Sequence, residues 1–243
     1  MTDHQIVTRD EWLSARKRLL VKEKEFTHLK DELSKERRAL PYVRVEKTYS
    51  FDAPDGKKTL PQLFDGARQL LVYHFMLGPG WGEGCPGCSF WADNFDGIDV
   101  HLKHRDVTFL AVSRAPLAEI ETYKRRMGWR FPWISSFGSD FNFDYGVSFT
   151  PDALKQGKVS YNYTLQDDLS DEMPGASAFI KDDDGTVFHT YSTYQRGLDQ
   201  VNGAYQWLDL TAKGRDEEGL PHPAAWVRRH DAYEDSNSLA GKS

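Results

Sequence analysis

The pattern of apolar and polar residues is helical at the start of the chain and changes after Pro41. Thr8 and Glu11 have the spacing of a capping box, in which two side chains accept hydrogen bonds from the backbone at a helix start. The helix is expected to run to about Ala39, because a proline cannot continue it. Apolar residues recur at every seventh position, but the positions between them are only half apolar. This narrow stripe consists of Trp12, Leu19, Phe26, Leu33 and Leu40.

Such a stripe suits either of two arrangements. The helix lies along its own domain, or it forms an arm through which two chains make a homodimer. The sequence leaves both open.

Beyond Pro41, short apolar runs alternate with turn signals, which is typical of strands and short helices. The apolar run from Leu70 to Leu77 predicts a central strand. Strands alternating with helices and followed by a hairpin describe an α/β sandwich with a mixed sheet. Further strands are expected near 43–51 and 106–113, a helical turn at 59–64, helices at 117–127 and 198–210, and a strand hairpin at 179–191.

We expect three parts in the chain: an N-terminal helical extension at 1–44, one domain at 45–213, and a C-terminal surface tail at 214–243. The last stretch, 236–243, is expected to be disordered.

The composition describes a chain that folds without metal or disulfide support. Of its 243 residues, 39% are hydrophobic and 13% aromatic, and a chain of this length buries roughly 70–75% of its unfolded surface. It has no long apolar run and its N-terminus lacks the features of a signal peptide, so we expect a cytoplasmic protein without membrane partners. The net charge of −6, with dispersed basic residues, argues against nucleic acid as a partner.

The only two cysteines, Cys85 and Cys88, follow the central strand in a glycine-rich loop and precede a segment with helical spacing. In a reducing compartment, such a pair indicates redox or metal chemistry rather than a structural crosslink. Cys85 is expected at the N-cap of a helix, with Pro86 at the first helical position. The helix dipole contributes up to ~2 kcal/mol there, which lowers a thiol pKa from about 8.5 to about 7. Cys85 is then the nucleophile, and Cys88, one turn later, resolves the mixed disulfide.

Several segments resemble the thioredoxin superfamily, in particular its peroxiredoxin-like branch. They are YSFDAPDGKKTLPQLFDGARQLLVYHFM at 49–76, RFPWISS at 130–136, DYGV at 144–147, and Phe179-Ile180-x-Asp182 with Gly185. The whole chain resembles a bacterial thioredoxin-like family catalogued as domain of unknown function 899, through GCPGCSFWADNFDG at 84–97, PWISSFGSDFNFDYG at 132–146 and VFHTYSTYQRG at 187–197. The resemblance implies a thioredoxin-like three-layer α/β/α sandwich and no established reaction.

The same resemblance implies roles for residues around the cysteines. Pro174 holds the position of the cis-proline that faces the disulfide in thioredoxins, an ordinary turn proline being the alternative. Tyr73 and His74 lie where thioredoxins keep a buried proton acceptor, but a histidine on a strand also suits a hydrogen-bonded core position. Trp81 belongs to an aromatic-rich region that suits either a binding pocket or plain core.

Three other functions stay open. Peroxiredoxins keep a Thr or Ser three residues before the reactive cysteine, where this chain has Gly82, and Pro79 is one position too close to Cys85. A thiol peroxidase therefore ranks below thiol–disulfide exchange. The aromatic residues also allow a non-catalytic module that binds a small molecule or a protein.

The third alternative is a copper or zinc site. Cys85 and Cys88, with His74 or His189, would supply thiolate and imidazole ligands. The related copper chaperones resemble Cys-x-x-x-Cys, however, which is one residue longer. The sequence therefore favours a thiol–disulfide oxidoreductase without a cofactor, acting on a protein or on a low-molecular-weight disulfide or thiol.

Overall fold

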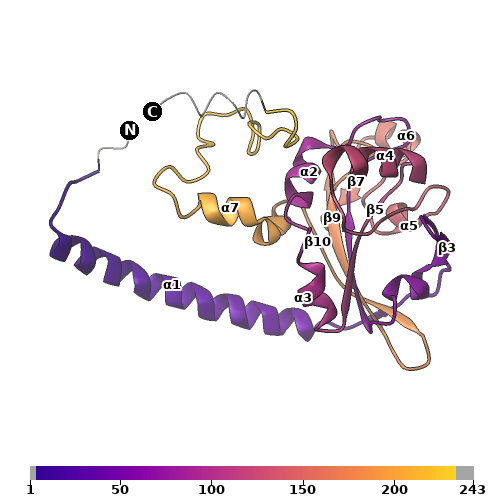
Figure 1. Cartoon of the computed structure of the whole chain (residues 1–243), viewed down its shortest axis with the longest axis horizontal. Helices are drawn as coiled ribbons and strands as arrows, with labels where there is room; N and C mark the ends of the chain where they lie inside the picture. Colours follow the sequence, from indigo (N-terminus) through magenta and orange to yellow (C-terminus); the bar gives the residue numbers. More distant parts are fainter. Residues whose placement is uncertain (1–3, 234–243) are drawn as a thin grey trace. The chain divides into compact units, whose positions relative to one another are not determined.

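A computed structural model describes residues 4–233, shown in Figure 1. Its contacts group the chain up to Pro41 into one unit and the chain from Tyr42 onward into another. The expected boundaries at residues 44 and 213 remain predictions, and the expectation of disorder at 236–243 lies outside the described residues. Within residues 4–233, no helix is long and apolar enough to cross a membrane.

The first unit consists of the helix α1 (Arg9–Arg38). It begins with the predicted capping box: the Thr8 hydroxyl accepts a hydrogen bond from the backbone N–H of Glu11 (3.3 Å), and the Glu11 carboxylate accepts one from the N–H of Thr8 (2.9 Å). It ends at its cap residue Ala39, two residues before the proline, as predicted. No side chain of this helix is buried.

The second unit is built on an eight-stranded mixed sheet in the order β1-β10-β9-β4-β5-β6-β2-β3. The central strand β4 (Gln69–His74) is parallel to β5 (Val107–Ser113) and antiparallel to β9 (Gly175–Lys181). β9 leads into β10 (Val187–Tyr194) through the predicted hairpin. The other strands of this sheet are β1 (Val43–Arg44), β2 (Ser50–Ala53), β3 (Gly56–Thr59) and β6 (Trp133–Ser135). A β-α-β unit beside an antiparallel hairpin is the thioredoxin-like arrangement, so the predicted fold class is confirmed.

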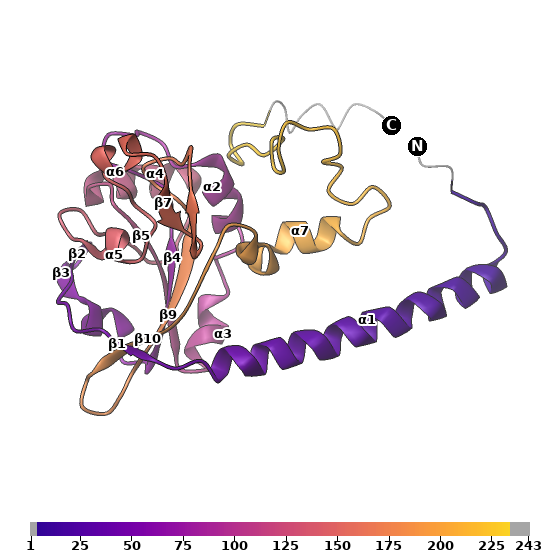
Figure 2. The ribbon, with the colours of Figure 1, turned by 180° about the vertical axis from the view of Figure 1, so that it is seen from behind.

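Helices cover both faces of this sheet, as Figure 2 shows from behind. One face carries α2 (Pro86–Ala92) and α4 (Leu117–Met127), which pack against Tyr73 and Phe75. The opposite face carries η1 (Leu60–Phe64) and α5 (Phe141–Asp144), which pack against Leu70 and Val72. Consecutive residues of β4 therefore belong to different cores, because side chains alternate along a strand.

Two parts of the chain differ from the sequence prediction. The last helix, expected at 198–210, is divided into η2 (Gln195–Val201) and α7 (Gly203–Leu208). Asn202 separates them because its backbone is extended and its side-chain oxygen caps α7 by accepting a hydrogen bond from the N–H of Tyr205 (3.1 Å). Elements that the prediction omitted include α5 and β6, and also α3 (Asp99–Lys103), α6 (Pro151–Lys155) and the two-stranded sheet of β7 (Val159–Tyr161) and β8 (Thr164–Gln166).

Candidate active site

The loop between β4 and α2 delivers the first cysteine to the end of the central strand. The backbone N–H of Cys85 donates a hydrogen bond to the carbonyl oxygen of Met76 (3.1 Å). Gly84 is required just before it, because a Cβ at this position would lie 2.6 Å from ring atoms of both Phe75 and Tyr123. The loop can therefore pass directly over the aromatic core.

The two cysteines occupy different positions on α2. Cys85 is the N-cap residue and Pro86 is the first helical residue, as the sequence predicts. Both cysteines are free thiols; Cys85 is partly exposed, whereas Cys88 is only 2% exposed. The unpaired N–H groups of the first helical turn lie next to Cys85. A molecule that enters the site therefore meets this sulfur first.

The structure gives Cys85 an acidic thiol, with a pKa lowered from 9.0 to about 6. The largest cause is a hydrogen bond from the thiol of Cys88 to the sulfur of Cys85. Burial opposes the shift, while the backbone N–H groups of Cys88 and Gly87 and the positive charge of Arg229 favour it. At neutral pH, Cys85 is therefore mainly a thiolate, the nucleophilic form of the residue.

Cys88 has the opposite character. Burial raises the pKa of its thiol well above the ordinary value, and the interaction with Cys85 raises it further. The hydroxyl of Tyr73 and the backbone N–H of Met76, 3.4 Å from the sulfur, donate hydrogen bonds to Cys88 and offset part of this effect. Cys88 therefore keeps its proton while Cys85 is charged, so the pair carries a single negative charge.

Tyr73 and His74 lie on opposite faces of β4, and only Tyr73 reaches the cysteines. His74 is buried in the other core, where its Nε2 lies 2.8 Å from the hydroxyl of Ser177. Burial lowers the pKa of His74 to about 3, so the imidazole is neutral. The structure therefore does not bring His74 to the thiols for proton transfer.

The four residues of the alternative metal site do not come together. His189 bonds through Nε2 to the hydroxyl of Ser192 (2.7 Å), and its ring packs against Phe179 on the face opposite to Cys88. In the described part of the chain, no three His, Cys, Asp or Glu side chains are grouped as metal ligands.

Pro174 and Trp81 stand in different relations to the site. Pro174 lines the pocket beside the cysteines. All peptide bonds between residues 4 and 233 are trans, so of the two alternatives for Pro174 the structure has the ordinary proline and not the cis-proline. Trp81 lies in the loop, with its indole nitrogen over Gly78, and packs against the core that contains Cys88. It is not among the residues that line the pocket.

A pocket of about 620 Å³ lies over the two cysteines. Tyr73, Met76 and Trp91 contribute apolar surface, together with Pro174 and Leu198. Pockets of this size accommodate small organic molecules.

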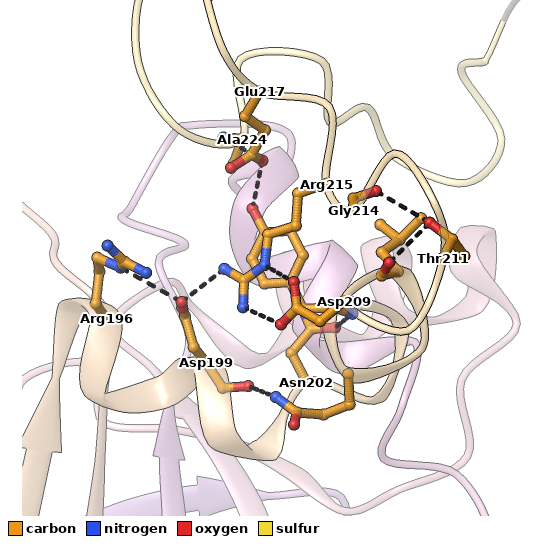
Figure 3. Close-up of polar contacts among 12 residues, drawn as sticks. Arg196, Asp199, Asn202, Asp209, Thr211, Gly214, Arg215, Glu217 and Ala224 are labelled. Carbon is orange, nitrogen blue, oxygen red and sulfur yellow. Dashed lines mark hydrogen bonds and ion pairs between the residues drawn. The ribbon is translucent and has the colours of Figure 1, made fainter. Parts of the chain in front are cut away.

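The charged side of this pocket is not predicted by any motif in the sequence. Arg215 donates two hydrogen bonds to the carboxylate of Asp209 (both 2.9 Å) and one to Asp199 (2.8 Å), as Figure 3 shows. Glu217 also lines the pocket. Arg215, Glu217, Pro223 and Ala224 therefore form one side of the pocket, from the segment that the sequence analysis assigned to the C-terminal tail.

Arg229 is another residue of the site that no sequence motif predicts. Its guanidinium donates two hydrogen bonds to the carbonyl oxygen of Gly84 (2.8 and 3.0 Å) and pairs with Glu83 (3.0 Å). A sequence signal existed, since Trp226 and Val227 are apolar residues inside a polar segment. Such residues need a buried contact, and Val227 is only 5% exposed.

The chain matches one family model across nearly its whole length. This is the family described as "Bacterial protein of unknown function (DUF899)", and the match covers residues 1–233. No match is found among curated proteins.

The chain is also similar, at low sequence identity, to several solved structures. A mutant of Xanthomonas campestris peroxiredoxin Q is 14% identical with a TM-score of 0.41, and the similarity covers 65% of this chain and 90% of that chain. Peroxidoxin BcpB from Mycobacterium tuberculosis is 13% identical with a TM-score of 0.39, covering 67% and 93%. A putative thiol:disulfide interchange protein DsbE from Chlorobium tepidum is 11% identical with a TM-score of 0.40, covering 67% and 95%.

Proposed function

The chain belongs to this family of bacterial proteins of unknown function, and we propose that it is a thiol–disulfide oxidoreductase in which Cys85 attacks and Cys88 resolves. One observation carries the proposal: an N-cap thiol with a pKa of about 6 receives a hydrogen bond from a buried, protonated thiol one helical turn away. A binding module has no need for such a difference between two cysteines.

The reaction proceeds in two exchanges. The thiolate of Cys85 attacks one sulfur of a substrate disulfide, which forms a mixed disulfide and releases the first substrate thiolate. Cys88 then loses its proton to the departing group and attacks the sulfur of Cys85. This second exchange forms the Cys85–Cys88 disulfide and releases the second substrate thiol. Two electrons pass from the protein to the substrate, and the reverse sequence oxidises a dithiol.

The experiment is an equilibration of the purified protein with glutathione buffers of graded redox potential, followed by acid trapping and intact-mass measurement. We expect a monomeric species lighter by two hydrogen atoms, because sulfurs at adjacent turns of a helix start can form a disulfide with little strain. Cys85→Ser and Cys88→Ser are the matched controls and should not give this species. If the wild type yields only chains crosslinked through single cysteines, the proposal is wrong.

Arg229 supports a second candidate, a thiol peroxidase. The sequence lacks the Thr of the peroxiredoxin loop, but Arg229 places a positive charge near the thiolate from the C-terminal segment. Attack of Cys85 on a hydroperoxide would cleave the O–O bond, leave a sulfenic acid on Cys85 and release an alcohol; Cys88 would then form the disulfide and release water.

Stopped-flow kinetics separate the two candidates. The fluorescence of Trp91, which lines the pocket, is expected to report oxidation of the pair. If the protein is an oxidoreductase for disulfides, hydrogen peroxide oxidises Cys85 no faster than it oxidises a free thiol of the same pKa. A large acceleration over that reference would favour the peroxidase.

A further inference from the structure

The C-terminal segment 215–231 covers the outer side of α2. Its Glu217 accepts hydrogen bonds from the hydroxyl of Tyr205 (3.0 Å), the indole N–H of Trp226 (2.8 Å) and the backbone N–H of Ala224 (2.8 Å). The ring of Trp226 then packs edge-on against Phe90 of α2, at 5.5 Å between centroids. These contacts fix the first half of the segment.

The second half is fixed around the cysteine loop. Arg229 bonds to Gly84, His230 lies 2.7 Å from the carboxylate of Asp93 at the end of α2, and Asp231 pairs with Arg126 of α4. Arg126 also pairs with Glu83 of the loop. The segment is therefore held on both sides of the reactive thiol.

Resting on the proposed function, we infer that the substrate is a small organic disulfide or its thiol, of neutral or positive charge, rather than a protein disulfide. The cysteines open into a pocket that has the C-terminal segment as one side and Pro174 as another. A protein disulfide must bring main chain up to the attacking sulfur, where the covering segment already lines the pocket and bonds to Gly84, next to Cys85. A small disulfide needs only the pocket of about 620 Å³.

The charges along the pocket decide which small disulfide fits. Its carboxylates are Asp199, Asp209 and Glu217, and its guanidinium groups are Arg196 and Arg215, so three negative charges face two positive ones. Arg215 is held by two of these carboxylates (Figure 3). The Arg196 side chain is 80% exposed and directed to Asp199 (3.4 Å). The pocket therefore offers apolar surface and one more carboxylate than guanidinium groups, and its better buried arginine, Arg215, is already paired.

The test measures reduction of four disulfides by the reduced full chain: 2-hydroxyethyl disulfide (neutral), cystamine (cationic), 3,3′-dithiodipropionate (dianionic) and insulin (protein). Each rate is divided by the rate of the same disulfide with dithiothreitol, which removes the effect of leaving-group pKa. We expect the normalised rates of the neutral and cationic probes to exceed that of the dianion by roughly tenfold, because the pocket has one more negative than positive charge. These two rates should exceed the rate with insulin by roughly a hundredfold, because the covering segment must open before a protein disulfide reaches Cys85.

A variant that loosens the cover completes the test. Trp226→Ala removes the contact with Phe90 and should narrow the ratio between the neutral probe and insulin by roughly tenfold, as local opening becomes easier. Trp207→Ala, which removes an indole that is 74% exposed, is the matched control and should leave the ratio unchanged. Equal normalised rates for insulin and the neutral probe would overturn the substrate class and leave the exchange chemistry standing. No reaction with any of the four would overturn the proposed function itself.

A separate observation concerns α1 alone. Its apolar stripe is exposed at every position: Trp12 47%, Leu19 52%, Phe26 66%, Leu33 44% and, just beyond the helix, Leu40 44%. The residues that flank the stripe carry charges in a regular pattern. In a parallel pair of helices, the residue before each stripe position faces the residue five places later on the partner. These pairs are Glu11 with Arg16, Arg18 with Glu23, Glu25 with Lys30, and Glu32 with Arg37.

All four pairs join opposite charges, and we infer that α1 forms a parallel two-stranded coiled coil with α1 of a second copy. An antiparallel pair aligned on the same stripe would instead place Arg16 against Arg37 and Glu25 against its own copy. Lys22 and Glu36 occupy companion positions of the seam and weaken it. The flanking charges therefore set partner and direction.

Charge reversal tests the register, with mass measured by light scattering in reducing buffer so that Cys85 forms no crosslinks. We expect a dimer for the wild type. Glu25→Lys with Glu32→Lys, and separately Lys30→Glu with Arg37→Glu, should each weaken the dimer by roughly tenfold. An equimolar mixture of the two variants should regain it, because every pair is then again opposite in charge. A monomeric wild type, or a dimer that neither variant weakens, would overturn the inference.

Discussion

Arg229 donates two hydrogen bonds to the carbonyl oxygen of Gly84, at 2.8 and 3.0 Å, and so connects the C-terminal segment to the residue before the reactive thiol. Its charge is one of the causes of the low pKa of Cys85. Arg229→Ala should therefore raise the pKa of Cys85, by up to about one unit for a neighbouring charge that is partly screened. The pH dependence of alkylation by iodoacetamide measures the shift.

Arg229→Lys is the control for this prediction. It keeps the positive charge but cannot donate the paired hydrogen bonds of a guanidinium, so the pKa should rise less than in Arg229→Ala. The result that contradicts the account is an unchanged alkylation profile in Arg229→Ala, with thermal unfolding confirming that the variant is folded.

Removal of the resolving thiol should stop the reaction halfway. Cys88→Ser should still attack a disulfide and then accumulate as a mixed disulfide through Cys85, because no second thiol can displace the bound partner. Cys85→Ser should accumulate nothing, since the remaining thiol is buried and protonated. Intact mass after reaction with 2-hydroxyethyl disulfide distinguishes the two. Equal adduct formation in both variants would show that Cys85 is not the specific attacking residue.

Tyr73 should affect the second exchange more than the first. Its hydroxyl donates a hydrogen bond to the sulfur of Cys88 and lowers the pKa of that thiol. Tyr73→Phe removes the donor, so release of the second thiol should slow by roughly tenfold, the usual value of one hydrogen bond to a charged group. Rapid-quench kinetics of the two steps provide the measurement. His74→Gln is the comparison on the same strand and should change neither step, because His74 lies on the other face.

The low pKa of Cys85 should make the reduced protein more stable as pH rises from 6 to 8.5. The unfolded thiol ionises near 9.0 and the folded one near 6, so the folded state releases its proton first and is stabilised in this window. The gain is lost as pH falls through 6, where both states bind the proton. From the linkage between proton binding and folding, we expect the free energy of unfolding to change by a few kcal/mol at most. Urea unfolding measures the free energy of unfolding of the wild type and of Cys85→Ser at both pH values. If the difference between the two proteins is the same at both, the pKa of Cys85 is not lowered on folding.

Local signals in the sequence were sufficient for the start of each of two helices. The spacing of Thr8 and Glu11 predicts the capping box of α1, and Cys85 followed by Pro86 predicts the N-cap of α2, because capping depends on residues three or fewer positions apart. The fold class followed from the order of strands and helices and from the resemblance of several segments to thioredoxin-like proteins.

Other parts of the site depend on contacts between residues distant in the sequence. The apolar run around Tyr73 and His74 does not show which of them faces the cysteines, because β4 is buried on both faces and its pattern does not alternate. Arg229 reaches the cysteine loop only because Trp226 and Val227 find buried partners on α2 and α7, and no local rule gives those partners. The charged side of the pocket likewise depends on contacts between separate segments, since Arg215 binds Asp199 and Asp209.

The pKa of Cys85 in the reduced wild-type protein tests the central claim most directly. Alkylation by iodoacetamide at a series of pH values measures it, since only the thiolate reacts. Cys88 is buried and should not contribute to the measured alkylation. The Cys88→Ala variant checks this, because Cys85 is then the only thiol that can react. The account predicts a midpoint near pH 6, moved upward when Cys88 is removed, because the largest cause of the shift is then lost. A midpoint near 9 in the wild type, the ordinary value of a cysteine, would contradict it.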